Sequence, residues 1–444
     1  NKNTFEKSLN LIKNKKQFYF LFFLSFIGVF VELLSVAVVI PVVVFLIEQD
    51  PIEKFQILKP IFNYLSISNK NEIISFSLFA IVIVYFFRFS FLIYLNYYKN
   101  LFSYNLSLNM KRDLIDKYLS QRYSYFFNEN SSRLIKNVIV EVSQFTGNAI
   151  NSIFYIFIDL FVISTVLISL IFYEPIISFI IAIFLCLVGL TLNSFSKDRV
   201  SKWGKLRFDL DQALMKSLLE IFNSIREIKV FNKKNFFIDN FIKKYSPLGY
   251  LGVKQQTFYA VIKQSYEMVT LFAFCILVFY LSSQNYSNQE ILTTIGIFAI
   301  AAFRLLPLFS RLLLGVQDIK FYLPSVNHLY EEFNELNKNI RLISNLNQSK
   351  NLNIKDSIDI KNISYSYDKD KKILDNISLK INKNDKIGIF GKSGSGKSTF
   401  VDIVFGLISP NNAPGLYIAP DTNDLVVMMN TFNVINEEIT IKDI

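Results

Sequence analysis

Long apolar segments alternate with polar, basic segments through the first 315 residues. Six of the apolar segments are long enough to cross a bilayer as helices. They cover residues 17–47, 72–98, 148–172, 175–195, 257–282 and 291–315. At a rise of about 1.5 Å per residue the first would be about 45 Å long, more than the roughly 30 Å hydrocarbon core, so we expect it to tilt or project. The pattern predicts a polytopic α-helical membrane domain over residues 1–315.

The connections between these segments differ strongly in charge. Residues 99–147 contain seven Lys or Arg and residues 196–256 contain thirteen, whereas the connection 282–290 contains none. Basic connections remain on the cytoplasmic side of bacterial membranes, so we expect both long connections to be cytoplasmic. Their apolar residues recur at helical spacing, as from Leu206 to Ile225. This spacing predicts cytoplasmic extensions of the membrane helices.

Beyond the sixth apolar segment the periodicity changes. Residues 316–353 begin as a helical extension and end in a polar linker. Apolar residues then alternate with polar ones around Ile358–Tyr367 and again at Ile377–Ile381, which is typical of strands. We therefore predict that a strand-rich domain begins at residue 354 and covers residues 354–444.

Residues 391–399 read Gly-Lys-Ser-Gly-Ser-Gly-Lys-Ser-Thr. The apolar run 386–390 precedes them, and residues 400–405 follow with a helical pattern, so the motif has the strand and helix that a phosphate-binding loop requires. The residues expected to bind ATP here are Gly391, Ser393, Gly394, Ser395, Gly396, Lys397, Ser398 and Thr399. The structural alternative is a glycine-rich turn between a strand and a helix.

The chemistry expected of this loop follows from its residue types. Glycines let backbone amides turn toward phosphate oxygens, and the N-terminus of the following helix adds partial positive charge. Lys397 would reach the β and γ phosphates, and the Ser398 hydroxyl would bind the Mg²⁺ ion that accompanies ATP. The predicted cofactors are ATP and Mg²⁺.

Composition agrees with a membrane protein, because 52% of the residues are apolar and 46 are Phe. The net charge of +11 falls mainly in the connections predicted to be cytoplasmic, so we attribute it to membrane topology and expect no nucleic-acid partner. Cys186 and Cys275 lie within apolar segments, which indicates a packing role and no disulfide framework. His328, the only histidine, is expected to lie on a solvated helix face.

Several segments resemble the ATP-binding cassette (ABC) exporters built as half-transporters, in which six membrane helices precede a nucleotide-binding domain. Besides the phosphate loop, they are Tyr123–Phe127, Ser131–Ile135, Ile225–Phe231 and Asn362–Tyr367. The resemblance implies an ABC exporter fold with an incomplete α/β nucleotide-binding domain. It also implies that Tyr367 stacks on adenine, the alternative being an aromatic residue on an edge strand.

Within that family, residues 297–307, 30–34 and 85–88 are similar to bacterial flippases of lipid-linked oligosaccharides. Charges are costly inside a membrane and tend to face a bundle interior or a wet cavity. By this resemblance Arg88, Arg304 and Arg311 would bind the pyrophosphate of the substrate. The alternative is that these arginines form structural ion pairs with Glu32, Asp159 and Glu267.

Only 45 residues follow Thr399, and they differ from the family pattern. They contain no Leu-Ser-Gly-Gly-Gln signature, no apolar strand ending in Asp-Glu and no histidine, and hydrolysis of ATP needs those groups. Met429 or Asn430 stands where the family has a glutamine. We therefore expect no catalytic residue among these 444 positions, by divergence, a disturbed reading frame or a truncated gene model.

The sequence as a whole predicts a multi-pass half-transporter of the bacterial inner membrane, with its nucleotide-binding domain in the cytoplasm. It would pair with a second subunit, a homodimer being favoured over a heterodimer, and flip a lipid-linked or amphipathic substrate. The alternatives are an exporter of glycolipids, peptides or drugs, and a non-hydrolytic ATP-binding subunit or truncated pseudo-transporter. Six membrane segments exclude a soluble phosphate-loop kinase or GTPase.

Overall fold

The computed structural model describes residues 7–8, 10–12, 15–47, 70–283, 288–344, 357–367, 372–382, 384–405 and 407–408. The chain forms two compact units. The helical unit contains residues 1–112 and 132–331, and the mixed unit contains residues 113–131 and 332–444. Each unit is described separately below.

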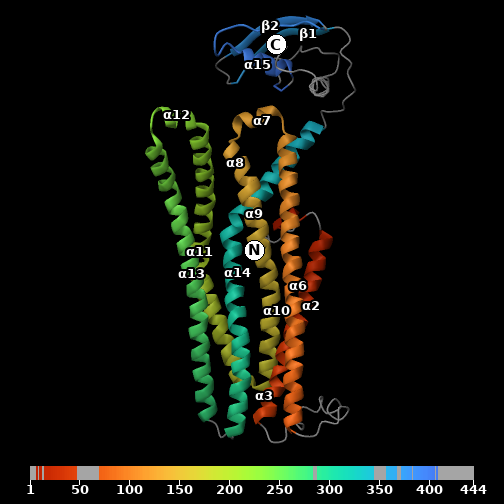
Figure 1. The fold of residues 1–444 in the computed structure, drawn as a ribbon, viewed down its shortest axis with the longest axis vertical. Coiled ribbons are helices and arrows are strands. Elements are labelled where there is room, and N and C mark those ends of the chain that lie inside the picture. The colour runs from red at the N-terminus through yellow and green to blue at the C-terminus, as the bar shows by residue number, and fades with distance from the viewer. Residues whose placement is uncertain are drawn as a thin grey trace. The chain divides into compact units, whose positions relative to one another are not determined.

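Six long helices dominate the helical unit and run side by side (Figure 1). They contain α2 (Lys15–Ala37), α6 (Lys70–Leu119), α10 (Ile150–Tyr173), α11 (Pro175–Asn223), α13 (Lys234–Ser283) and α14 (Asn288–Ser344). Shorter elements are α3 (Val39–Ile47), α8 (Ser131–Lys136), α9 (Val142–Gln144) and α12 (Ile225–Val230), with π-helical turns η2 (Asn137–Glu141) and η3 (Phe145–Ala149). Five of the six expected segments lie entirely in helices long and apolar enough to cross a membrane, and the first, 17–47, does so only as far as Ala37.

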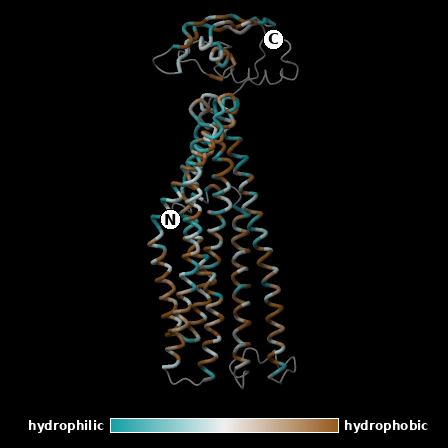
Figure 2. Tube along the Cα trace, turned by 60° about the vertical axis from the view of Figure 1, so that its left-hand side comes forward, coloured by the Kyte–Doolittle hydropathy of each residue, from teal (hydrophilic) through white to brown (hydrophobic). Residues whose placement is uncertain are grey.

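The predicted helical extensions are confirmed, because α6, α11 and α13 continue without interruption beyond their apolar segments. Figure 2 shows hydrophobic residues concentrated along one part of these helices, and hydrophilic residues gathered toward the ends that carry α8 and α12. Each long helix thus combines a membrane-spanning part with a polar part.

The first apolar segment differs from the expected single helix. Helix α2 ends at Ala37, Val38 forms a turn, and α3 begins at Val39. Pro41 explains the break, because proline has no N–H to bond to the Ala37 carbonyl and its ring crowds that oxygen. The segment therefore consists of two helices, and neither approaches the length predicted for one.

The core of the helical unit lies between α10, α11, α13 and α14 and includes Val162, Tyr266 and Leu305. Many other apolar side chains point outward, such as Phe172 and Phe303, which are each 87% exposed. In a membrane this exposure is not costly, because lipid tails are as apolar as the side chains. Cys186 and Cys275 are free and also exposed, so the packing role expected for them is wrong. The parts of α11 and α13 that carry them are largely apolar, and sequence alone did not indicate which face packs.

Helices α11 and α14 make a very close approach at Gly204. A methyl group on Gly204 would lie 2.2 Å from the backbone oxygen of Phe321. One turn further along α11, the Arg207 guanidinium donates a hydrogen bond of 2.7 Å to the Ser325 hydroxyl on α14. The contact therefore depends on the missing side chain at residue 204.

A buried ionic cluster surrounds this contact. Lys136 lies 3.3 Å from Glu141, and Arg207 lies 3.7 Å from Glu141 and 3.3 Å from Asp211. Lys136 and Glu141 are fully buried. Two cations and two carboxylates balance one another here, joining α8 and η2 to α11.

His328 lies beside this cluster and is not solvated as expected. Its Nε2 is 2.8 Å from the Asn137 Oδ1, its ring centroid is 5.0 Å from that of Phe208, and the side chain is half-buried. The sequence showed a polar helix, but the partners on η2 and α11 come from tertiary packing.

The mixed unit contains α7 (Tyr123–Asn128), β1 (Ser357–Ser366), β2 (Lys372–Asn382) and α15 (Lys397–Val404), the last three blue in Figure 1. Strands β1 and β2 pair antiparallel, with Ile358 opposite Ile381 and Ile363 opposite Ile377. The register shifts between Ile360 and Ile363, where Asn362 has a φ of 52°. This bulge explains why the alternation seen in the sequence slips by one residue. The two predicted strands are confirmed.

The strand expected at residues 386–390 is not formed. Ile387 is 44% exposed and Phe390 is 95% exposed, so this apolar run is not covered. A strand leading into a phosphate loop needs neighbouring strands and covering layers, and among the described residues the only sheet is the β1–β2 hairpin. Met429 and Asn430 lie outside the described residues.

Candidate functional site

The phosphate loop has the backbone geometry that its glycines permit. Gly394 and Gly396 adopt φ values of 79° and 85°, and α15 begins directly after them at Lys397. Side chains are strained at these angles. At Gly396 a methyl group would also lie 2.9 Å from the Ile373 side chain. Both conformation and space therefore require glycine where the loop enters the helix.

The Lys397 side chain bends back over the loop. Its ammonium donates hydrogen bonds to the backbone oxygens of Gly391 and Lys392, at 2.9 and 2.8 Å. This places a cation above the N-terminus of α15, where unpaired N–H groups already attract anions. A side chain at Gly391 would fill this space, because its methyl would lie 2.8 Å from the Ser395 Oγ. The residues present fit a phosphate group.

The remaining predicted residues lie around this cradle. Ser393 and Ser395 are exposed in the turn, Ser398 is exposed in the first turn of α15, and Thr399 is buried beneath it. A hydroxyl at the position of Ser398 suits Mg²⁺, which bound there with ATP would supply charge neutralisation of the phosphates. The structure thus brings together residues 391–399 around the start of α15, with residues 391–395 and Ser398 exposed.

Tyr367 lies next to the start of α15. Its hydroxyl is 3.4 Å from the Thr399 Oγ1, and its ring is 47% exposed. Two other rings lie perpendicular to it, Tyr365 at 5.0 Å and Phe127 at 5.6 Å between centroids. Burial raises the pKa of the Tyr365 hydroxyl, and the neighbouring Tyr367 adds to the effect. An exposed aromatic ring beside the phosphate cradle is suitably placed to stack on a base.

Phe127 was not predicted as a site residue. It belongs to α7, and its ring lies at 88° to that of Tyr367. The sequence indicated only that the aromatic run Tyr123–Phe127 resembles part of an ABC exporter. Four of the five residues in this run are aromatic, and this feature of the sequence could have indicated an aromatic contact.

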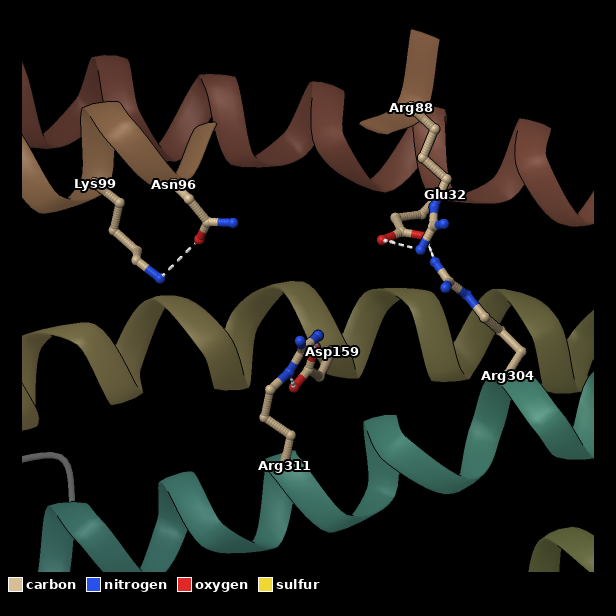
Figure 3. A network of polar contacts seen from close by, with 7 residues as sticks. All are labelled: Glu32, Arg88, Asn96, Lys99, Asp159, Arg304 and Arg311. Carbon is tan, nitrogen blue, oxygen red and sulfur yellow. Dashed lines mark hydrogen bonds and ion pairs between the residues drawn. The ribbon is translucent and has the colours of Figure 1, made fainter. Parts of the chain in front are cut away.

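In the helical unit, the three predicted arginines all form ion pairs (Figure 3). Arg88 on α6 donates a 3.0 Å hydrogen bond to Glu32 on α2, and Arg304 on α14 also pairs with Glu32. Arg311 on α14 donates a 2.7 Å hydrogen bond to Asp159 on α10. The structural ion pairs that the sequence left open are therefore present. Glu267, grouped with them in the sequence, is exposed on α13.

The same region carries excess positive charge. Lys99 is 3% exposed and donates a 3.2 Å hydrogen bond to Asn96 (Figure 3). Three arginines, Arg88, Arg304 and Arg311, thus share the two carboxylates of Glu32 and Asp159. The buried Nε of Arg304 has no hydrogen-bond partner. A buried donor without an acceptor is costly.

Comparison with known proteins identifies the family of the chain. The model of the ABC transporter transmembrane region matches residues 18–305, well over half of the chain, and that of the ABC transporter domain matches residues 374–425. The chain therefore belongs to the ABC transporter family. Its predicted fold class is confirmed: a helical membrane domain with six candidate spans, followed by part of a nucleotide-binding domain.

Individual relatives match parts of the chain. The lacticin-481/lactococcin-DR transport/processing ATP-binding protein of Lactococcus lactis subsp. lactis is 28% identical over 304 residues, 66% of this chain and 42% of that protein. The energy-coupling factor transporter ATP-binding protein EcfA of Pediococcus pentosaceus is 45% identical over 71 residues, 15% of this chain and 25% of that protein. The chain thus spans less than half the length of either relative.

A solved structure shows the same fold. A bacterial Atm1-family ABC exporter with ATP bound superposes with a TM-score of 0.62 at 11% sequence identity. The superposition covers 94% of this chain and 70% of the exporter. The arrangement of helices is therefore that of an ABC exporter.

Proposed function

We propose that this chain is a subunit of an ATP-driven exporter in the bacterial inner membrane, with its nucleotide-binding part in the cytoplasm. The observation that carries this proposal is the glycine cradle closed by Lys397, in a chain that also has six candidate spans. ATP would bind at residues 391–399 with Tyr367 against adenine, and Ser398 would hold Mg²⁺. The basic extensions of α11 and α13 support a cytoplasmic location.

A second copy of the subunit is the proposed partner. ATP held between two nucleotide-binding domains would make contacts only in their closed arrangement, and so would shift the membrane helices toward the outward-open state. The family resemblance favours such a dimer. In this view, an isolated chain binds ATP without completing a hydrolytic site.

For the substrate we propose a lipid-linked or otherwise amphipathic molecule with an anionic group. The three arginines that share Glu32 and Asp159, and the buried Arg304 Nε, support an anion at this place. A pyrophosphate has both the charge and the acceptor oxygens for paired guanidinium groups. Arg88, Arg304 and Arg311 would bind it by exchanging part of their present ion pairing.

Photolabelling in liposomes tests this proposal. A photoactivatable lipid-linked sugar should label the wild-type chain and should not label Arg304→Ala. The Arg304→Lys variant, which retains the charge, should keep part of the labelling. Arg226→Ala, at an exposed position on α12, is the matched control and should behave as wild type. Equal labelling of Arg304→Ala and wild type would contradict the proposed anion site.

Peptide export is the second candidate. It is supported by the 28% identity to the lactococcal transport/processing protein, which covers 66% of this chain. If an excess of cationic peptide blocks photolabelling while the free lipid-linked sugar does not, peptide export is favoured. A non-hydrolytic ATP-binding subunit is the third candidate, and ATP binding without turnover in a complete dimer would favour it.

A further inference from the structure

Tyr367 lies just beyond the paired residues of the β1–β2 hairpin. Strand β1 ends at Ser366, which pairs with Lys372. The ladder thus ends before Tyr367, and the orientation of the tyrosine ring depends on side-chain contacts. A ring that is free to change rotamer loses this freedom when a ligand stacks on it, and the loss weakens binding. The neighbours of Tyr367 therefore bear directly on its proposed role.

Side chains from three elements contact Tyr367. The Thr399 Oγ1 on α15 lies 3.4 Å from its hydroxyl. The rings of Tyr365 on β1 and Phe127 on α7 each lie at 88° to the Tyr367 ring, with centroids 5.0 and 5.6 Å away. Perpendicular arrangements at such distances are favourable for aromatic pairs. Two perpendicular rings therefore restrict the orientation of Tyr367.

Phe127 is the neighbour that is distant in sequence. Residues 113–131, which include α7, belong to the same compact mixed unit as β1 and α15. Within α7, the ring of Tyr123 lies 4.9 Å from that of Phe127 at an angle of 75°. Residues four apart are neighbours on one helix face. Tyr123 thus supports the Phe127 ring, which in turn contacts Tyr367.

These contacts leave ring surface open beside the phosphate loop. Phe127 is 43% exposed and Tyr367 is 47% exposed. Thr399, which contacts the Tyr367 hydroxyl, is the last residue of the loop motif 391–399. The Tyr367 ring therefore lies within reach of a nucleoside whose phosphates occupy that loop.

We infer that Phe127 is a positioning residue of the nucleotide site, because its ring holds Tyr367 in the orientation that stacks on adenine. The inference rests on the proposed binding of ATP at residues 391–399, and it adds to that site a residue of α7. A contacting side chain that is already ordered binds more tightly, since less freedom is lost on binding. Phe127 thus contributes to affinity for the base and not for the phosphates.

The test compares ATP with inorganic tripolyphosphate, which has the phosphates but no base. Isothermal titration calorimetry measures the affinity of each, with Mg²⁺, for the full chain in detergent. Phe127→Leu keeps an apolar side chain but removes the ring. We expect it to weaken ATP binding about two- to tenfold and to leave tripolyphosphate binding unchanged. Phe127→Tyr, which keeps the ring, should bind ATP as wild type does.

Two further variants separate positioning from a general loss of structure. Phe126→Leu is the matched control, because it removes the adjacent ring of α7, which lies 5.4 Å from that of Tyr125, and it should bind ATP as wild type does. Phe127→Leu combined with Tyr367→Leu should bind ATP as Tyr367→Leu alone does, since Phe127 acts through Tyr367. If the melting temperature shows that Phe127→Leu does not fold, Phe127→Met removes the ring in its place.

Unchanged ATP affinity in folded Phe127→Leu overturns the inference, and weaker binding in Tyr367→Leu would show at the same time that the proposed nucleotide site stands. Equal weakening of ATP and tripolyphosphate also overturns it, because the loss would then be structural. Independent, additive effects of the two substitutions do the same. If wild type binds neither ligand, the proposed function fails together with the inference.

Discussion

Gly204 shows how one residue sets the distance between two helices. Its Cα faces the backbone of α14, and a Cβ would lie 2.2 Å from the Phe321 oxygen, an atom that has no rotamer by which to move away. We predict that Gly204→Ala destabilises the helical unit by about 1–3 kcal/mol, the usual cost of overpacking. Thermal unfolding in detergent measures this.

Gly252 on α13 provides the matched control. A methyl group there meets nothing within 4 Å, so Gly252→Ala should be neutral or stabilise the helix by about 0.5–1 kcal/mol. Equal melting temperatures for Gly204→Ala and Gly252→Ala would contradict the close approach of α11 and α14.

Tyr367 is the residue whose exposed ring should affect nucleotide affinity. We predict that Tyr367→Leu weakens ATP binding by about 1 kcal/mol or more, because stacking of a base on an aromatic ring contributes about 1–3 kcal/mol. Tyr367→Trp should retain the affinity. Titration with a fluorescent ATP analogue measures both, and unchanged affinity in Tyr367→Leu would support the alternative of a structural edge-strand aromatic.

At the scale of elements, the cluster of Lys136, Glu141, Arg207 and Asp211 joins α8 and η2 to α11. Removing one charge from a buried ion pair leaves the charge of its partner uncompensated. We predict that Glu141→Gln lowers stability by about 3 kcal/mol, since Lys136 and Arg207 would then share Asp211 alone. The melting temperature of the purified variant measures this.

Glu220 is the control for that substitution. It pairs with Lys216 at 3.9 Å on the same α11, but both side chains are more than half exposed. Exposed pairs of this kind contribute about 0–1 kcal/mol, so Glu220→Gln should melt as wild type. Equal effects of the two substitutions would show that the Glu141 cluster is not buried in the folded protein.

The elements themselves were largely predictable from the sequence. Segments such as 175–195 contain no charged residue and are far longer than a strand, so they indicated helices without ambiguity. The β1–β2 alternation and the phosphate loop were equally local signals. By contrast, the run 386–390 satisfies a strand pattern but forms no strand among the described residues, because a strand depends on neighbours that the pattern does not contain.

The site residues were likewise predictable only where the signal was local in the sequence. Sequence indicated that Arg304 and Arg311, seven residues apart, share a helix face. It did not indicate that one pairs with Glu32 and the other with Asp159, since those carboxylates come from α2 and α10. The partners of Lys136 and His328 were missed likewise, because tertiary packing alone brings α8, η2, α11 and α14 together.

At the scale of the molecule, the distribution of Lys and Arg predicts orientation. Residues 196–256 should be cytoplasmic, and the end of α13 at Ser283 should face the opposite side. We predict that a membrane-impermeant maleimide labels Ser224→Cys only in inside-out vesicles and Ser283→Cys only in right-side-out cells. Cys186 and Cys275 are first replaced by Ala. Labelling of both positions from one side would contradict the orientation.

ATP binding at the phosphate loop is the central property proposed for this chain. The measurement is photolabelling of the full chain in liposomes with azido-ATP, comparing wild type, Lys397→Ala and Lys392→Ala. Lys392 is an exposed lysine of the same loop whose backbone oxygen, not its side chain, contacts Lys397. We predict that wild type and Lys392→Ala are labelled and that Lys397→Ala is not. Equal labelling of all three, or of none, would contradict the assignment of this chain as an ATP-binding transporter subunit.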